Sequence, residues 1–142
     1  MFDTLPTQIG AGLTVLVVAF AFLKGDEPER IGAGAYVLAW FASLLVQGDG
    51  ASPGTQWGLM GIDMIMLGVW VALAWKSRRS WPVWAAALQS LVSVSHVLTL
   101  VDIRPPASAF IAVINLASVG ILLALAIGTF WAWQERRAAG LE

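Results

Sequence analysis

The chain has 142 residues, of which 58% are hydrophobic and 12% are charged, and its formal net charge is −1. Soluble domains are about 45–50% apolar and about 25% charged, and a domain of this length cannot bury so much apolar surface by itself. The bilayer must therefore act as solvent, while the lack of cysteine and the near-neutral charge argue against a disulfide scaffold, a thiolate zinc site and nucleic-acid binding.

The hydropathy pattern predicts an all-α fold, a bundle of five transmembrane helices with no soluble domain. A span needs about 17–25 apolar residues, because a helix rises about 1.5 Å per residue and the hydrocarbon core is about 30 Å thick. In chain order, the predicted helices cover residues 7–23, 30–47, 56–75, 81–101 and 107–133. The last three are long enough outright and the second is at the lower limit. Whether the first crosses fully rests on its hydropathy alone.

The prolines support this division. Proline suits the first turn of a helix, where its missing N–H costs nothing, and disrupts a helix interior. All six lie at or just before the start of a predicted helix: Pro6, Pro28, Pro53, Pro82, Pro105 and Pro106. We expect Asp26 and Ser80 to cap the second and fourth helices. The first loop, from Gly25 to Arg30, is expected to be a solvated turn.

The distribution of Lys and Arg predicts the orientation in the membrane. Seven of the eight lie in the first loop, the third loop and the C-terminal tail, which share one side: Lys24, Arg30, Lys76, Arg78, Arg79, Arg136 and Arg137. The opposite side has only Arg104. Because basic residues concentrate in cytoplasmic loops, the N-terminus is predicted outside and the C-terminus in the cytoplasm. We expect a bacterial cytoplasmic (inner) membrane.

Most of the eight tryptophans lie near predicted helix ends. Indole rings favour the headgroup level, where the ring is partly dry and the N–H finds a partner. We therefore expect an interfacial belt made of Trp57 at the outer side and, at the cytoplasmic side, of Trp75, Trp81, Trp84, Trp131 and Trp133. Trp40 and Trp70 lie deeper and are expected to pack in the bundle or to line a cavity.

Three polar side chains from three predicted helices share one depth in the outer part of the membrane. Asp63, the one charged residue of seventeen well inside a span, lies about 9 Å from the outer end of the third helix. His96 lies about 7 Å from the outer end of the fourth, and Asn115 about 10 Å inside the fifth. An ionisable residue inside a membrane helix is costly, so it indicates a functional site.

Other polar residues extend this layer. Gln89, Ser93 and His96 share one face of the fourth helix at spacings i, i+4 and i+7, and Thr14 and Ser43 reach a similar depth. We hypothesise a polar cluster that opens to the outside, with Asp63 and His96 as its titratable pair. The competing interpretation is that these residues form interhelical hydrogen bonds without a further function, each worth about 0.6 kcal/mol on average.

The chemistry of this cluster is limited by its single histidine. No metal or cofactor is predicted, since haem would need His96 from two subunits across a symmetry axis. Ser93 and Ser95 lie too near His96 in sequence for a persuasive Ser–His–Asp triad with Asp63, and no nucleophile elbow is present. No catalytic residue is therefore predicted.

Small residues recur every four positions along the fifth helix, at Gly120, Ala124 and Gly128. Such a stripe allows close approach of another helix, either of the same chain or of a second subunit. A second surface feature is the basic group of Lys76, Arg78 and Arg79 beside Trp75 and Trp81, which suits anionic lipid headgroups. The positive-inside rule alone also explains this group.

Five predicted spans, many tryptophans and this chain length resemble the tryptophan-rich sensory (translocator) proteins. In that family a long first loop with Trp and Pro residues covers the ligand pocket, whereas the first loop here is only Gly25 to Arg30. The resemblance is one of architecture and implies no residue role.

From the sequence we expect a non-enzymatic inner-membrane protein that binds a small ligand, a lipid or a partner subunit at the polar cluster. A small transporter or proton-coupled conductance subunit that uses Asp63 and His96 is the alternative. A small membrane enzyme is a third class, which no motif supports. The expected partners are the lipid bilayer and either further copies of the chain or a larger membrane complex, without nucleic acid.

Overall fold

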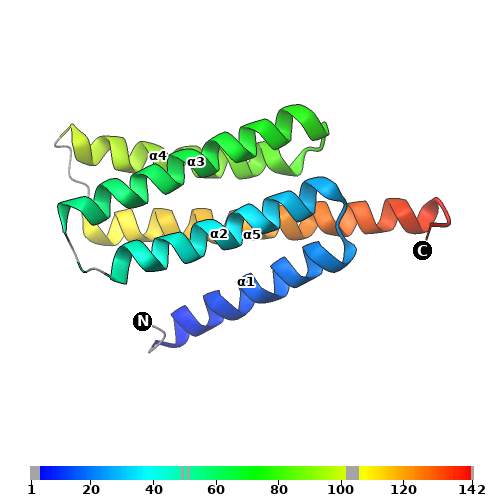
Figure 1. Ribbon diagram of the computed structural model, residues 1–142, viewed down its shortest axis with the longest axis horizontal. Coiled ribbons are helices and arrows are strands. Elements are labelled where there is room, and N and C mark those ends of the chain that lie inside the picture. The colour runs from blue at the N-terminus through cyan, green and yellow to red at the C-terminus, as the bar shows by residue number, and fades with distance from the viewer. Residues whose placement is uncertain (1–3, 49, 51, 102–105, 142) are drawn as a thin grey trace.

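The computed structural model describes residues 4–48, 50, 52–101 and 106–141, and this part of the chain folds into five helices (Figure 1). They are α1 (Leu5–Lys24), α2 (Glu27–Gly48), α3 (Pro53–Ser77), α4 (Trp81–Leu100) and α5 (Ala107–Ala138). Each is long and apolar enough to cross a membrane. The predicted number and order of helices is therefore confirmed.

Helix α5 differs most from its predicted range, because it continues to Ala138 rather than ending at Trp133. The apolar stretch ends at Trp133, but the following Gln, Glu, Arg and Ala residues all have high helix propensity. The helix ends just before Gly140, whose φ of +73° is a left-handed conformation that glycine adopts readily. The predicted boundary was too early because hydropathy identifies the apolar part of a helix, and a helix can continue beyond it.

Neither of the two predicted side-chain caps, Asp26 and Ser80, is observed. Ser52, which was not predicted, caps α3 in a capping box with Thr55, whereas the Ser80 side chain makes no cap hydrogen bond. The carboxylate of Asp26 pairs with arginines instead, and the backbone N–H of Asp26 donates to Glu29 Oε2 at 2.9 Å. Pro105 lies outside the described residues.

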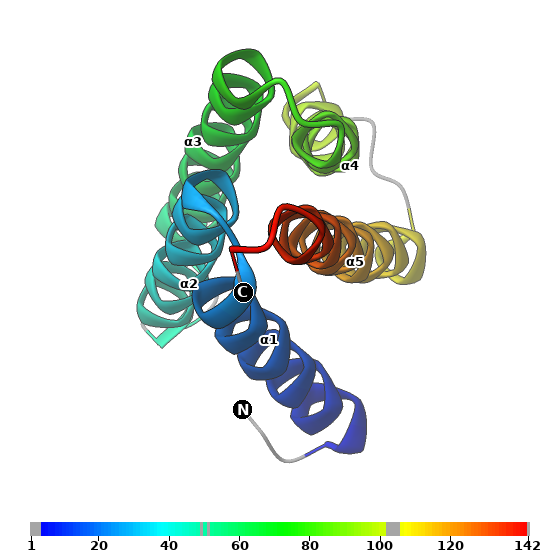
Figure 2. The ribbon, with the colours of Figure 1, turned by 90° about the vertical axis from the view of Figure 1, so that its right-hand side faces the viewer.

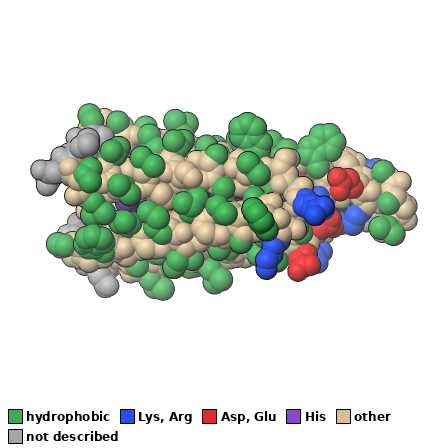
Figure 3. All heavy atoms as spheres, turned by 90° about the horizontal axis from the view of Figure 1, so that it is seen from above, with side chains coloured by type: hydrophobic (Ala, Val, Ile, Leu, Met, Phe, Trp, Pro, Cys, Tyr) green, Lys and Arg blue, Asp and Glu red, His purple; other side chains and the backbone are tan. Residues whose placement is uncertain are grey.

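The two ends of the bundle differ in composition. At the N-end lie the starts of α1, α3 and α5 and the ends of α2 and α4, and the C-end is opposite (Figure 1). Every Lys and Arg in the described part of the chain lies at the C-end, where the charged side chains gather in Figure 3. This asymmetry between the two ends is the one that the sequence predicted.

The helices do not pack equally. Helix α4 lies between α3 and α5, α2 packs on α3, and α1 contacts α2 and α5. Figures 1 and 2 show α1 diverging from the other helices toward its N-terminus. The most extensive helix contacts are therefore those of α4 with α3 and α5, and of α2 with α3.

Trp81 is the main exception to the predicted belt, because its side chain is only 4% exposed. Its ring meets the fully buried Trp70 edge to face, with centroids 5.8 Å apart. A Cβ added at Gly32 would lie 2.7 Å from Trp81 Cη2, and one at Gly128 would overlap the same indole. Trp81 is thus a core residue, and its placement in the belt is wrong.

The other tryptophans fit their predicted surroundings. Trp57, Trp75, Trp84 and Trp131 are exposed on the bundle surface, as an interfacial position requires. Trp133 is half-buried and lies beneath Lys24 and Arg137 in cation–π contacts at the C-end. Trp70 packs in the core, as its depth predicted, while Trp40 is half-buried beside Phe41.

The small-residue stripe of α5 lies against α4 of the same chain. A Cβ added at Gly120 would lie 2.6 Å from Leu88 Cδ1, and Gly128 supports the Trp81 indole. Ala124 between them is buried. The sequence left open whether this stripe packs against the same chain or against a second subunit. The described contacts are with α4 of the same chain.

Candidate functional site

Asp63 of α3 and His96 of α4 are in direct contact near the N-end. His96 Nε2 lies 2.8 Å from Asp63 Oδ2, and Gln89 Nε2 donates to Asp63 Oδ1 at 3.0 Å. Gln89 and His96 lie on one face of α4, as their i, i+7 spacing requires. Both oxygens of the one carboxylate deep inside the helices are therefore held by α4.

The other ring nitrogen of His96 has no partner. His96 is only 5% exposed, and its Nδ1 is buried without a hydrogen bond, as is the hydroxyl of nearby Ser93. A buried polar atom without a partner costs about 1–3 kcal/mol, so each one calls for a physical explanation. The contact with Asp63 gives Nε2 a hydrogen-bond partner, but the burial of Nδ1 without a partner still needs an explanation.

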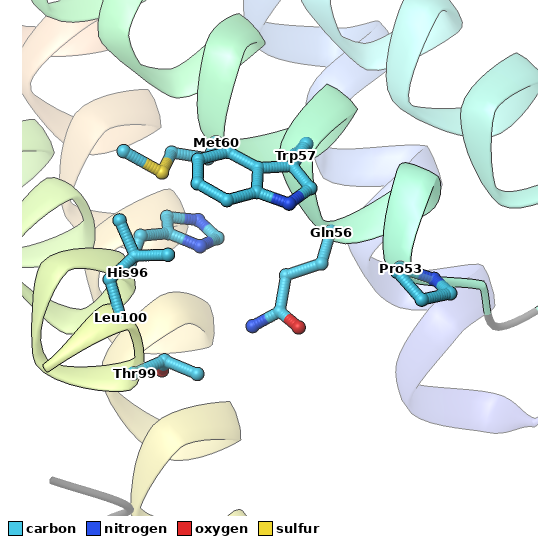
Figure 4. Close-up of a pocket in the computed structure, with 7 residues that line it drawn as sticks. All are labelled: Pro53, Gln56, Trp57, Met60, His96, Thr99 and Leu100. Carbon is cyan, nitrogen blue, oxygen red and sulfur yellow. The ribbon is translucent and has the colours of Figure 1, made fainter. Parts of the chain in front are cut away.

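Two hollows meet at His96 near the N-end. The first, with a volume of about 380 Å³, lies in the groove between α3 and α4 and is lined by Pro53, Gln56, Trp57, Met60, His96, Thr99 and Leu100. The second, of about 480 Å³, shares Pro53, Gln56 and His96 and extends to Phe110 of α5. Figure 4 shows the nitrogen-bearing edge of the His96 ring and the Gln56 side chain directed toward the first hollow.

Phe110 holds the His96 ring from the side of α5. The two ring centroids are 5.7 Å apart and the planes meet at 82°, an edge-to-face arrangement. With Nε2 fixed by Asp63 and one ring side fixed by Phe110, the imidazole has a defined orientation. This fixes the direction in which Nδ1 points.

Asn115, which shares the depth of Asp63 and His96, does not join them. Its side chain is exposed on α5, so the three-helix cluster is a two-helix site. Depth along a helix follows from sequence position, but the direction of a side chain depends on how far each helix is rotated about its axis. That rotation is set by packing, which the hydropathy pattern does not specify.

Thr14 and Ser43 also lie apart from the site. The hydroxyl of each bonds within its own helix, Thr14 to the Gly10 carbonyl at 2.9 Å and Ser43 to the Ala39 carbonyl at 2.8 Å. Thr14 is buried next to the Tyr36 side chain, which interacts with it by a hydrogen bond. Such pairs fit the interpretation of membrane polar residues as helix–helix contacts.

Several residues that line the hollows were missed by sequence reasoning. Gln56, Met60 and Asp63 follow each other at i, i+4 and i+7 on α3, and Thr99 is one turn beyond His96 on α4. This spacing relative to Asp63 and His96 was the available signal. It was weak because Met, Thr and Gln near a helix end are common without any functional role.

The C-end carries a polar network that the sequence did not predict. Glu29 is fully buried: its Oε1 accepts from Trp81 Nε1 at 2.8 Å and lies 3.4 Å from Arg79 Nε. Arg79 also pairs with Asp26 at 2.8 Å, and Arg136 of α5 binds the same aspartate. The expectation of a solvated first loop is therefore wrong. Two of its residues, Asp26 and Glu29, connect the start of α2 to the start of α4 and to the C-terminal part of α5.

The basic residues proposed for lipid headgroups do not form one group. Arg79 faces inward onto Asp26 and Glu29, while Lys76 and Arg78 are exposed at the C-end. Arg78 is the C-cap of α3 and has a left-handed φ of +55°. Only Lys76 and Arg78 keep a position on the surface from which a headgroup can be reached.

No group of three or more His, Cys, Asp or Glu side chains in the described part of the chain is placed to hold a metal ion. No family model matches the chain, and no curated protein or solved structure was found to be similar to it. The function must therefore be inferred from the site itself.

Proposed function

We propose that this chain is a non-enzymatic membrane protein that binds a small ligand in the hollows beside His96. The observation that carries the proposal is the buried Nδ1 of His96, which has no partner and belongs to a residue that lines both hollows. A histidine that served only to join α3 and α4 would need Nε2 alone. Burying the second nitrogen without a partner is a cost that a bound ligand would offset.

We propose that the N-end, and with it the ligand site, lies in the outer leaflet of a bacterial inner membrane, because basic residues concentrate on the cytoplasmic side. The seven basic residues at the C-end support this orientation. The core toward the C-end supports binding rather than passage, because Met66, Trp70, Trp81 and Leu125 are packed there in one buried cluster. A ligand that enters from the N-end would meet this cluster beyond the site.

Filling the hollow tests this proposal. Met60→Trp places an indole in the first hollow without changing Asp63 or His96, and we expect it to abolish retention of a bound small molecule. Native mass spectrometry of the chain released from mild detergent measures this as the loss of an adduct. Ile65→Trp is the matched control, because Ile65 lies on the exposed surface of the same helix. The proposal is wrong if the wild-type chain carries no adduct, or if Met60→Trp retains it equally.

A second function is favoured by the direct contact of Asp63 and His96. A carboxylate and an imidazole 2.8 Å apart can exchange a proton between two helices, which suits a proton-coupled transporter or conductance subunit. We rank this function below ligand binding, because the packed apolar cluster toward the C-end lies between the site and the other end of the described bundle.

Proton flux separates the two functions. If the chain conducts protons, proteoliposomes loaded with a pH-sensitive dye should acidify under a valinomycin-driven potential, and Asp63→Asn should reduce the rate to that of protein-free liposomes. Asparagine keeps the shape and one acceptor oxygen toward α4 but cannot take up a proton. Ser95→Ala is the control, because the Ser95 hydroxyl bonds to the Leu91 carbonyl of its own helix. We expect no dye response above protein-free liposomes for the wild-type chain, and a response that Asp63→Asn removes would show the second function instead.

A further inference from the structure

The described contacts of the site restrict the chemistry of its ligand. Both oxygens of Asp63 are engaged by α4, one with Gln89 and the other with His96. Among the described residues that line the two hollows, none is Lys, Arg, Asp or Glu. A ligand that fits this lining is neutral, since a charged group would be buried without a partner charge.

The hydrogen-bonding group on offer is His96 Nδ1. When Nε2–H donates to Asp63, the neutral imidazole has Nδ1 as an acceptor, and the protonated imidazole has Nδ1–H as a donor. The Asp63 carboxylate supports either form, because it accepts the Nε2–H in both. The same atom can therefore accept from a ligand hydroxyl or donate to a ligand carbonyl.

The walls of the hollows fit a flat apolar ring. Trp57 and Met60 of α3, Leu100 of α4 and Phe110 of α5 provide aromatic and aliphatic surface around His96. Gln56 extends into the first hollow from the helix opposite His96, so its amide can meet a second oxygen on the ring (Figure 4). Pockets of this type, mostly apolar with a few converging polar groups, fix the orientation of small ligands.

The position of the hollows favours a ligand that is dissolved in the lipid. Trp57 and Leu100 line the first hollow and are also exposed on the surface of the bundle, among other apolar side chains. A ligand with an apolar tail can therefore place its ring beside His96 while its tail remains outside. A small water-soluble ligand would not use this apolar rim.

We propose that the site binds the ring of a quinone or its quinol, with one ring oxygen on His96 Nδ1. This inference rests on the proposed function and specifies its ligand. A quinone is a neutral ring with opposed oxygens that are carbonyls in one form and hydroxyls in the other, which matches the two hydrogen-bonding states of Nδ1. Both forms can bind: Nδ1–H donates to a carbonyl of the quinone, and Nδ1 accepts from a hydroxyl of the quinol.

His96→Gln provides the sharpest test. The glutamine amide keeps a donor where Nε2 contacts Asp63 but has no group at the position of Nδ1. With the chain in lipid nanodiscs, an azidoquinone photolabel is expected to modify residues 53–60, residues 96–100 or Phe110, and decylubiquinone is expected to compete with it. We expect His96→Gln to weaken this competition about tenfold, as for loss of one buried hydrogen bond, and Ser95→Ala to leave it unchanged.

Three results would contradict binding of a quinone at this site. Competition that is equal in wild type, His96→Gln and Met60→Trp would show that the quinone only partitions into lipid, and would overturn the inference. An adduct in native mass spectrometry whose mass is not that of a quinone would also overturn it, while the proposed function would stand. If the wild-type chain carries no adduct and shows no site-specific label, both are wrong. Met60→Trp leaves the Asp63–His96 contact in place, so it tests the site even if His96→Gln folds poorly.

Discussion

Replacing Trp81 by alanine is expected to lower the free energy of unfolding by about 3–5 kcal/mol, the range for removing a large buried aromatic side chain. Trp81 fills the space between Trp70, Gly32 and Gly128, and its Nε1 donates to the fully buried Glu29. The substitution therefore leaves a cavity and removes a hydrogen-bond donor from the buried carboxylate of Glu29. Reversible unfolding in mixed micelles, followed by circular dichroism, measures the change.

Trp84→Ala is the matched control for this prediction. Trp84 is on the same helix one turn later, but it is 68% exposed, so its loss should change the free energy of unfolding by no more than about 0.5 kcal/mol. Trp81→Phe keeps most of the ring and removes only the N–H, and it should fall between the two. Equal losses for Trp81→Ala and Trp84→Ala would mean that Trp81 belongs to the interface and not to the core.

The helices of this fold were predictable from local chemistry. A membrane span must be apolar over a fixed length, and proline is tolerated only near its start, so residues such as Pro53 and Pro82 mark helix starts. The lysines and arginines then divide the two ends of the bundle. These rules act within one helix or one loop, and they need no knowledge of how the helices pack.

What the sequence could not provide was rotation of each helix about its axis. Asp63, His96 and Asn115 share one depth, yet only the first two meet, because Asn115 is on the exposed side of α5. Gln89 and His96 could be assigned to one face because both belong to α4. Pairing between helices depends on side-chain packing, which a hydropathy pattern does not encode.

The two errors at the C-end have a common cause. Trp81 and Glu29 were assigned to the interface and to a solvated loop from their positions in the sequence, yet both are buried and joined by a hydrogen bond. A glutamate is buried when it is paired and hydrogen-bonded, and its partners come from residues about 50 positions away. A carboxylate in a short loop between two spans, with tryptophan and arginine in the next loop on the same side, is a pattern to examine in other membrane bundles.

Removing the positive partner of Glu29 should have an effect as large as that of Trp81→Ala. We expect Arg79→Ala to lower the free energy of unfolding by about 3–5 kcal/mol, because breaking a buried ion pair on one side leaves an uncompensated charge. Arg79 contacts Glu29 at 3.4 Å and Asp26 at 2.8 Å, so one substitution loosens the joint between the starts of α2 and α4. The same unfolding experiment in mixed micelles measures it.

Arg78→Ala is a close control, since Arg78 precedes Arg79 directly but is exposed, and its substitution should have little effect. The double variant Arg79→Ala with Glu29→Gln tests the cause. Glutamine keeps an acceptor for Trp81 Nε1 but carries no charge, so it should recover part of the stability that Arg79→Ala loses. If the two losses simply add, the charge of Glu29 is not what Arg79 compensates, and the contribution of Arg79 comes from its pairing with Asp26 and Glu135.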